Sequence, residues 1–385
     1  MRTTRLAAAL AAAVLVPGVS ISVSAHDGQT FTVNCSRGQT IAKALELGDA
    51  RKPLVLIIRG LCKENVVINR DRVTLQGDPP RVATVQAVNP KDHTIAVMAT
   101  WIRIEGLTVS GGSNGIWTSG ASQLVVADSV IQNAGLNGIH LTYSYGRIGR
   151  TTIQNNGING LMLYAAQAAV MNSELSVNAG SGIKLDGNST LDISGGTISA
   201  NGASGIYGQR SDANIRGTHI TGNGTDLTLI ENLRRGVSGL QSTLEIRDSY
   251  IMNNTGRGIA AEIGSTLDVG STVVRGNGHE GVLIYGGSSG HLTGGTFSGN
   301  NLDGVSVGVN STAQIVDGAT IMNNARNGIT LFAGSKLWVF NPITIGANAQ
   351  YGLACNDGES SAANVALISF SPPNGWGNGS CSGYY

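Results

Sequence analysis

The stretch Asn324-Ala325-Arg326-Asn327-Gly328-Ile329-Thr330-Leu331 carries a pattern that returns through most of the chain. Its mark is a glycine followed directly by Ile, Leu or Val. These glycines are Gly115, Gly138, Gly160, Gly182, Gly205, Gly236, Gly258, Gly281, Gly304, Gly328 and Gly352. Their spacing is 22 to 24 residues, with one interval of 31, and so fixed a period indicates a stacked repeat.

An asparagine stands four residues before most of these glycines. The asparagines are Asn156, Asn178, Asn201, Asn254, Asn277, Asn300, Asn324 and Asn348, and Asn223 falls in the repeat with the long interval. Asparagine favours turns, and stacked amides can hydrogen-bond to one another along a column. We therefore interpret this column as structural.

Each repeat contains three short segments in which apolar and polar residues alternate, as in Gly328-Ile329-Thr330-Leu331 and Lys336-Leu337-Trp338-Val339. This period of two is typical of strands with one buried face. Three short strands and three turns account for the repeat length. We predict an all-β fold, a single-stranded right-handed parallel β-helix with a short N-terminal capping helix. A helical solenoid fits poorly, since no window of ten residues has helical spacing and glycine destabilises helices.

The coil pattern Ile-x-x-Asn-x-x-x-Gly-Ile resembles the repeats of right-handed parallel β-helix proteins of the pectin-lyase-like superfamily, over roughly residues 60 to 355. That superfamily includes polysaccharide lyases, glycoside hydrolases, mannuronan epimerases, periplasmic accessory proteins and non-catalytic adhesins. The resemblance implies an architecture and leaves the activity open.

The N-terminus has the features of a secretory signal peptide: Arg2 and Arg5, an apolar run from Leu6 to Val16, and a cleavage site after Ala25. We divide the chain into a signal peptide (1–25), an N-terminal cap (26–60), the β-helix (61–355) and a C-terminal cap (356–385). The segment Gln39 to Leu47 is expected to form the capping helix. We expect a secreted or periplasmic protein with no membrane span, because no later apolar run reaches 18 residues.

Charge and cysteine content narrow the function classes further. Without Arg2 and Arg5 the formal charge falls from +1 to about −1, which argues against a nucleic-acid partner. The four cysteines fall near the two ends of the repeat array, and in an exported protein we expect two disulfides, Cys35–Cys62 and Cys355–Cys381. Metal binding is the less favoured alternative, because no Cys-x-x-Cys spacing is present.

In a parallel stack, equivalent positions of successive repeats become neighbours. Position +1 from the repeat glycine should point inward, and positions +2 and +4 outward. Residues with chemical functions gather at these outward positions in five consecutive repeats. They are Trp117, His140, Thr142, Tyr164, Lys184, Asp186, Tyr207 and Gln209, with Arg210 at the end of the last strand. We call these nine residues the strip.

We expect the strip to bind an anionic or neutral glycan, and its composition suits an acidic polysaccharide. Its aromatic residues can stack on sugar rings, and its cations can neutralise a uronate carboxylate. A uronate lyase or C5-epimerase begins by removing the proton at C5, which requires a base, an acid and nearby cations. We assign His140 and Tyr164 as the acid–base pair, with Lys184 and Arg210 on the carboxylate. Trp117, Thr142, Asp186, Tyr207 and Gln209 would bind the substrate.

Other interpretations remain open. The polygalacturonase motifs and the Asp-Pro-His-Asp motif of mannuronan epimerases are absent, and we interpret His93 as a loop residue several coils from the strip. A non-catalytic cell-surface, periplasmic or adhesive scaffold is the alternative function. We expect no cofactor; Asp186 alone is too small a ligand set for calcium. The long interval carries a charged insertion from Thr225 to Arg235, which should form a loop and is as compatible with structure as with binding.

Overall fold

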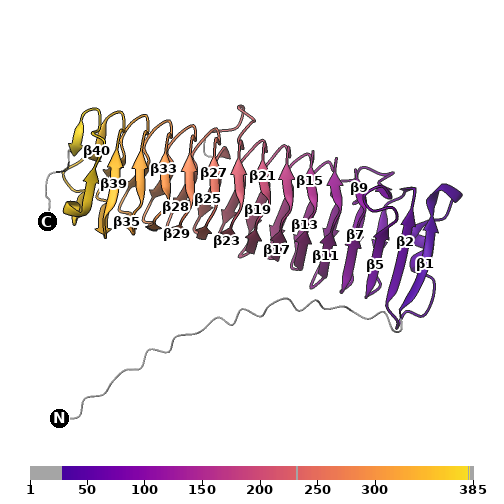
Figure 1. Cartoon of the computed structure of the whole chain (residues 1–385). Coiled ribbons are helices and arrows are strands. Elements are labelled where there is room, and N and C mark those ends of the chain that lie inside the picture. The colour runs from indigo at the N-terminus through magenta and orange to yellow at the C-terminus, as the bar shows by residue number, and fades with distance from the viewer. Residues whose placement is uncertain (1–27, 231–232, 380, 382–385) are drawn as a thin grey trace, which may run out of the picture.

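The computed structural model describes residues 28–230, 233–379 and 381, so the expected signal peptide lies outside the described residues. Within the described residues the chain winds into a parallel β-helix whose coils follow one another in a single row from the N-terminal to the C-terminal end (Figure 1). Each full coil contributes one strand to each of three parallel sheets, which we name A, B and C. The fold prediction is confirmed.

Sheet A has the longest strands, mostly of five residues. It runs through β1 (Gln29–Asn34), β2 (Leu54–Arg59), β5 (Val73–Gly77), β8 (Ile102–Glu105), β11 (Gln123–Ala127), β14 (Tyr145–Gly149), β17 (Gln167–Met171), β20 (Thr190–Ser194), β23 (Asp212–Arg216), β26 (Thr243–Arg247), β29 (Thr266–Gly270), β32 (Ser289–Thr293), β35 (Thr312–Val316), β38 (Lys336–Phe340) and β41 (Ser361–Ala363).

Sheet B has the shortest strands. It runs through β3 (Leu61–Lys63), β6 (Thr84–Gln86), β9 (Thr108–Ser110), β12 (Val130–Gln132), β15 (Thr152–Gln154), β18 (Glu174–Ser176), β21 (Thr197–Ser199), β24 (His219–Thr221), β27 (Tyr250–Met252), β30 (Val273–Arg275), β33 (Thr296–Ser298), β36 (Thr320–Met322), β39 (Ile343–Gly346) and β42 (Ile368–Phe370).

Sheet C follows the repeat glycines. It runs through β4 (Val66–Ile68), β7 (Ile95–Val97), β10 (Ile116–Thr118), β13 (Ile139–Thr142), β16 (Leu161–Tyr164), β19 (Ile183–Asp186), β22 (Ile206–Gln209), β25 (Val237–Leu240), β28 (Ile259–Glu262), β31 (Val282–Tyr285), β34 (Val305–Gly308), β37 (Ile329–Phe332), β40 (Tyr351–Cys355) and β43 (Gly377–Gly379).

The repeat glycine is required by close packing between coils. A Cβ atom at Gly138 would lie 2.5 Å from Cγ2 of Ile153 and 2.8 Å from the carbonyl oxygen of Gly160 in the next coil. The residue after each glycine points inward, and Ile116, Ile139 and Leu161 are fully buried in successive coils. The glycine therefore lets the apolar interior stack in exact register.

The asparagine column forms a hydrogen-bonded ladder, as the sequence predicted. From Asn156 to Asn374, each amide nitrogen donates to the side-chain oxygen of the next asparagine, with N···O distances of 2.9 or 3.0 Å. The residue before the asparagine takes the left-handed conformation, as at Asn155 and Asn253. The ladder thus closes the turn between sheets B and C in coil after coil.

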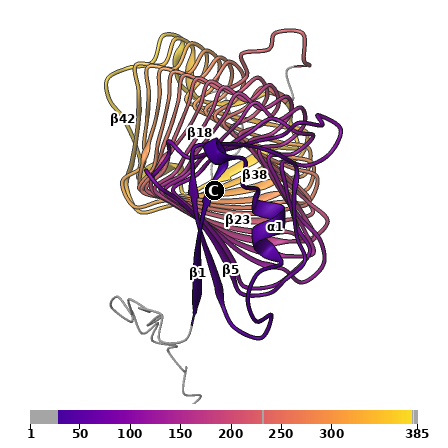
Figure 2. The ribbon, with the colours of Figure 1, turned by 90° about the vertical axis from the view of Figure 1, so that its right-hand side faces the viewer.

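Both ends of the row carry extra structure. The capping helix is α1 (Ile41–Leu45), inside the expected segment, and Figure 2 shows it at the N-terminal end of the solenoid. A 3₁₀ turn, η1 (Cys35–Arg37), precedes it, and η3 (Val365–Leu367) lies near the C-terminus. Strand pairing runs through both expected caps, because β1 and β2 belong to sheet A and β41 to β43 extend the three sheets.

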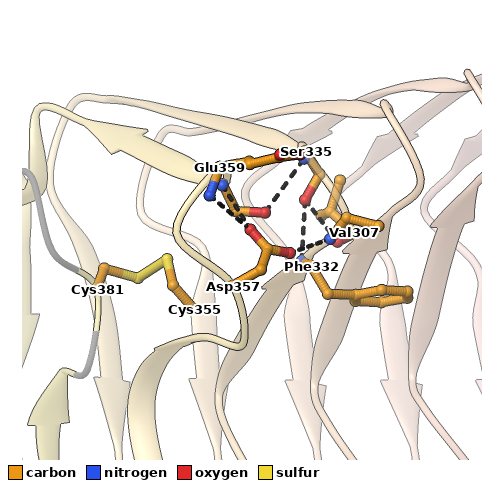
Figure 3. Close-up of a disulfide and its surroundings, with 9 residues drawn as sticks. Val307, Phe332, Ser335, Cys355, Asp357, Glu359 and Cys381 are labelled. Atoms are coloured by element: carbon orange, nitrogen blue, oxygen red, sulfur yellow. Dashed lines mark hydrogen bonds between the residues drawn. A yellow bond between two sulfur atoms is a disulfide. The ribbon is translucent and has the colours of Figure 1, made fainter.

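The two expected disulfides are formed. Cys35 pairs with Cys62 at a Cα–Cα distance of 5.0 Å, and Cys355 pairs with Cys381 at 4.7 Å. Figure 3 shows the second disulfide beside the turn of Asp357, whose carboxylate accepts backbone N–H groups from Glu359 and Ser360 at 3.0 and 2.7 Å. Each disulfide ties an end of the chain to the stack.

Candidate functional site

The nine residues of the strip lie along a single sheet. Trp117 is on β10, His140 and Thr142 on β13, and Tyr164 on β16. Lys184 and Asp186 follow on β19, Tyr207 and Gln209 on β22, and Arg210 directly after β22. Strand register places Trp117 beside His140, and Thr142 beside Tyr164. Their side chains are half-buried or exposed on the outer face of sheet C, while the alternate residues are buried inside.

The N-terminal end of the strip includes a residue that the sequence analysis placed elsewhere. His93 does lie in a loop, before β7, but its ring stacks on that of Trp117 with centroids 4.8 Å apart, so its predicted position several coils from the strip was wrong. Its Nδ1 accepts hydrogen bonds from Ser113 Oγ at 2.9 Å and Asn114 Nδ2 at 3.2 Å. Burial lowers the pKa of His93 below its ordinary value. This neutral imidazole and the indole present two stacked rings.

His140 occupies the next coil and is also held neutral. Burial lowers its pKa first, and the nearby His93 lowers it further by charge repulsion when that ring is protonated. Its Nε2 lies 3.3 Å from Thr142 Oγ1 on the same strand. An uncharged imidazole on an outer face can accept a proton, which is the property that a general base requires.

Tyr164 lies on the strand after His140, displaced by two positions along the sheet. Its ring meets the edge of the Tyr143 ring, with centroids 5.9 Å apart, and its side chain is 43% exposed. Within the described residues no hydrogen bond joins Tyr164 to His140. The two proposed acid–base residues therefore share a face and leave a gap that a ligand group would have to bridge.

The C-terminal end of the strip carries its charges. Lys184 Nζ lies 5.9 Å from the centroid of the Tyr207 ring, and Arg210 Nη2 lies 3.5 Å from Asp186 Oδ1. Burial raises the pKa of Tyr207, so its phenol stays protonated at neutral pH. No carboxylate in the described part of the chain pairs with Lys184. Lys184 is thus the cation best placed to meet an anionic ligand.

A buried ion pair closes the strip at its C-terminal end. Arg235 comes at the end of the charged insertion and has only 1% of its side chain exposed. Its guanidinium crosses the outer face of sheet C to pair with Glu262, and it also donates to Ser238 Oγ at 2.9 Å. The tip of the insertion instead projects from the row of coils (Figure 1), with Leu227 72% exposed.

Beyond this ion pair lies a hollow that the sequence analysis missed. It has a volume of about 510 Å³ on the outer face of sheet C, and its lining includes Glu280, Arg326, Tyr285 and Phe332. Asp303 is fully buried below Arg326 and pairs with it. The two aromatic rings are 6.3 Å apart. We call this hollow the C-terminal trough.

A signal for the trough is present in the sequence. The residue before the repeat glycine is Asn or Ser in the middle coils and becomes charged in four consecutive ones, at Arg235, Arg257, Glu280 and Asp303. Arg257 pairs with Glu280 at 2.8 Å. The alternation of inward and outward residues does not mark this position as an outward column, although its long side chains reach over the sheet.

Potential metal ligands also approach one another at the N-terminal end. One donor atom from each of Cys35, Cys62 and Glu64 lies within 4.8 Å of the other two. The two sulfurs share a disulfide, and the Glu64 carboxylate accepts the backbone N–H groups of Ile41 and Ala42 at the start of α1. These atoms are already engaged in holding the cap, which does not suit a metal ion.

Comparison with known families identifies the architecture. The family described as right handed beta helix region matches residues 94–238 and 235–369, which together make up most of the chain. The chain belongs to this family. The residues that match the family include the strip, the insertion and the trough, so all three features are built on β-helix coils.

Individual relatives are distant. A cell surface glycoprotein of Methanothermus fervidus is 27% identical over 124 residues, covering 31% of this chain and 20% of that protein. The match thus spans only a fifth of that relative's length.

Several solved structures align with this chain at low sequence identity. Tailspike protein 2 of Escherichia coli O157:H7 bacteriophage CAB120 aligns with a TM-score of 0.48 and 9% identity, over 68% of this chain and 38% of the tailspike. A periplasmic alginate epimerase aligns with a TM-score of 0.42 and 11% identity, over 93% and 82% of the two chains. The A-module of an Azotobacter vinelandii mannuronan C-5 epimerase gives 0.41 and 16%, over 89% and 93%.

The model contains no helix, among the residues that it describes, with the length and apolar character needed to cross a bilayer.

Proposed function

We propose that this protein binds an acidic glycan on the outer face of sheet C, along the strip from Trp117 to Arg210. The observation that carries the proposal is the single row formed by stacked rings and charged side chains in consecutive coils, beginning at His93–Trp117 and ending at Lys184–Tyr207. Aromatic faces suit the apolar faces of sugar rings, and Lys184 suits a carboxylate. A neutral glycan would leave Lys184 without an anionic partner.

Export of the protein is part of this proposal. The N-terminal 25 residues have signal-peptide features, and both disulfides require an oxidising compartment. The distant relative is named as a cell surface glycoprotein. A secreted or periplasmic protein would meet acidic polysaccharides of cell envelopes or the extracellular matrix.

Uronate chemistry at His140 is a second candidate function. The neutral imidazole of His140 would abstract the C5 proton of a bound uronate, and Tyr164 on the next strand would donate a proton. Lys184 and Arg210 would stabilise the enolate that forms from the carboxylate. The lowered pKa of His140 favours this assignment. The alternative is a non-catalytic adhesive or structural protein that uses the same face only to bind.

Binding can be tested by titrating the mature protein with polymannuronate and polygalacturonate, and with a neutral glucan for comparison. Replacing Trp117 by Ala or Lys184 by Met should weaken acidic-glycan binding by at least about tenfold, or about 1.4 kcal/mol. Gln314→Ala, on the exposed face of sheet A near the other end, is the matched control. Unchanged affinity in both strip variants would refute the proposed site.

Catalysis requires a separate measurement. Lyase activity would release unsaturated sugars that absorb near 235 nm, and epimerase activity would change the C5 configuration seen by NMR. His140→Gln should abolish either signal while leaving binding within about threefold, because Gln retains a polar group near Thr142. Binding without product on both polymers would favour the non-catalytic alternative.

A further inference from the structure

A separate hollow lies on the outer face of sheet A, near the N-terminal end. Its volume is about 530 Å³, and its lining includes Trp101, Arg103, Tyr145 and Arg147. Strand register orders the lining into two columns that run across β5, β8, β11 and β14. The edge column is Arg72, Trp101, Gln123 and Tyr145, and the central column is Thr74, Arg103, Val125 and Arg147.

The two columns repeat the same pair of side-chain types. Trp101 and Arg103 point outward from one coil, and Tyr145 and Arg147 point outward two coils later, about 9.6 Å away at the usual strand spacing. Val125 lies between the two arginines and is much shorter. The hollow therefore presents a ring beside a guanidinium on β8 and again on β14, with the short side chain of Val125 between the two arginines.

The conformation of Trp101 keeps its indole available. Its φ is +61°, in the left-handed region that bulky residues rarely adopt, at a cost of about 1–3 kcal/mol. The side chain is nevertheless 63% exposed, so no burial of the ring compensates for this conformation. Arg72, directly before the preceding strand of sheet A, is also left-handed (φ 58°), so the conformation belongs to the turn and presents the indole at the edge of the hollow.

The charges around the hollow are predominantly positive. Arg147 is exposed and has no hydrogen-bond or ion-pair partner among the described residues, while Arg103 is paired with Glu105 at 2.6 Å. No acidic residue lines the hollow. Residues 28–150 contain 13 Lys and Arg against 8 Asp and Glu. The hollow thus suits an anion.

Aromatic residues connect this hollow to the strip. Tyr143 and Tyr145 lie on either side of the corner between sheets C and A, with 60% and 43% of their surfaces exposed. The Tyr143 ring contacts that of Tyr164, which belongs to the strip. A shallower hollow of about 410 Å³ at the corner is lined by Tyr143 and Tyr145 as well.

We propose that the sheet A hollow binds an acidic sugar residue, and that the glycan reaches it from the strip by turning the corner at Tyr143. The sugar ring would lie against Trp101 or Tyr145, and its carboxylate would accept hydrogen bonds from Arg147, whose planar guanidinium matches two oxygens. The glycan would lie along the solenoid axis on sheet C and would cross the corner from sheet C to sheet A at Tyr143. The ligand class rests on the proposed function, whereas the hollow itself does not depend on the strip.

The test uses the full mature protein and uronate oligosaccharides of two and eight residues. Arg147→Gln and Trp101→Ala should each weaken binding of the eight-residue oligomer by at least about tenfold. Lys336→Gln and Trp338→Ala are matched controls, since they occupy the edge and central columns of the same sheet at its other end and should change affinity less than twofold. Unchanged melting temperatures would confirm that each variant folds.

The outcomes separate this inference from the proposed function. If the hollow variants and Trp117→Ala all lose affinity for the eight-residue oligomer, the result supports one continuous path. Tyr143→Ala should then weaken binding of the eight-residue oligomer and leave binding of the disaccharide unchanged. If only the hollow variants lose affinity, the result supports binding in the hollow and refutes binding on the strip. If only Trp117→Ala loses affinity, the result refutes binding in the hollow and supports binding on the strip. Equal binding of polyglutamate or of anionic phospholipid vesicles would overturn the assignment to a sugar.

Discussion

Arg235 shows how a single side chain divides the outer face of sheet C. The guanidinium is buried on what is formally the outside of a solenoid, because Glu262 and Ser238 enclose it. On the N-terminal side of this ion pair the residues at position +2 are half-exposed, and on the other side they are buried, from Ser238 to Ala354. The ion pair therefore separates the strip from the trough.

Removing one member of this pair should destabilise the protein more than removing both. Glu262→Gln leaves a buried positive charge without its anion, and we expect a loss of about 3–5 kcal/mol in the free energy of unfolding. The double variant Arg235→Met with Glu262→Met should recover most of that loss. Urea unfolding followed by circular dichroism measures both values.

The exposed pair Arg216–Glu245 on sheet A provides the control. Glu245→Gln should cost less than about 1 kcal/mol, because both side chains remain in water. If Glu245→Gln and Glu262→Gln lowered the free energy of unfolding by similar amounts, burial would not be what makes the Arg235–Glu262 pair important for stability.

The two neutral histidines predict a dependence of stability on pH. Burial lowers the folded-state pKa values of His93 and His140 below the unfolded value of about 6.5. Well above pH 6.5 both histidines are neutral in the folded and the unfolded chain, so they make the free energy of unfolding no more dependent on pH. As the pH falls below that value, the histidines of the unfolded chain bind protons more readily than those of the folded protein, and the free energy of unfolding declines. His140→Gln should flatten this decline between about pH 6.5 and 5.

The measurement is the difference in unfolding free energy between His140→Gln and the unaltered protein at several pH values, since the carboxylates titrate alike in both. His291 lies on the outer face of sheet A, 3.3 Å from Asp268, and is half-exposed, so His291→Gln supplies the matched variant. Parallel pH curves for His140→Gln and the unaltered protein would show that His140 is not held neutral.

At the scale of elements, the asparagine ladder joins the turns between sheets B and C. Asn277 receives two hydrogen bonds from Asn254 and donates to Asn300 and to the carbonyl oxygen of Ile251, all within the buried interior. Asn277→Ala should cost about 2–4 kcal/mol, because the buried donors of Asn254 lose their acceptor. Urea unfolding measures this loss.

The exposed Gln314 on sheet A is the control for the ladder. Gln314→Ala should change the unfolding free energy by less than about 0.5 kcal/mol. If Asn277→Ala had an equally small effect, the ladder would be incidental to stability.

The sequence predicted the coils because each depends on local signals, namely the glycine that permits close approach and the alternation of inward and outward residues. It also placed Trp117 to Gln209 on one face, since alternation alone determines that face. It missed the trough, because Arg257 and Glu280 stand at the position before the repeat glycine, which the alternation of inward and outward residues does not mark as an outward column. His93 was missed because Thr94 replaces the repeat glycine in that coil, which hides its equivalence to the later ones.

At the scale of the whole molecule, the charge is divided along the solenoid axis. Residues 28–150 carry a formal charge of +5, and residues 151–385 carry −5, since they contain 10 Lys and Arg against 15 Asp and Glu. The net charge near zero therefore conceals a positive N-terminal end. This division places the sheet A hollow in the field that attracts an acidic polymer.

The same linear arrangement determines how stability is distributed. Each coil pairs only with its neighbours, so a solenoid is stabilised by a chain of local interfaces and its ends are exposed on one side. The disulfides lie at these ends, where each closes a loop of 26 or 27 residues and contributes about 3 kcal/mol.

We therefore expect local effects from their removal. The double variant Cys35→Ser with Cys62→Ser should accelerate amide hydrogen exchange in β1 to β4 and leave β13 to β28 unchanged, and Cys355→Ser with Cys381→Ser should do the same in β40 to β42. Hydrogen exchange resolved by mass spectrometry measures each segment in both variants. Equal acceleration in the central strands would show that the row unfolds as one cooperative unit, and the nearest-neighbour description would then fail for this protein.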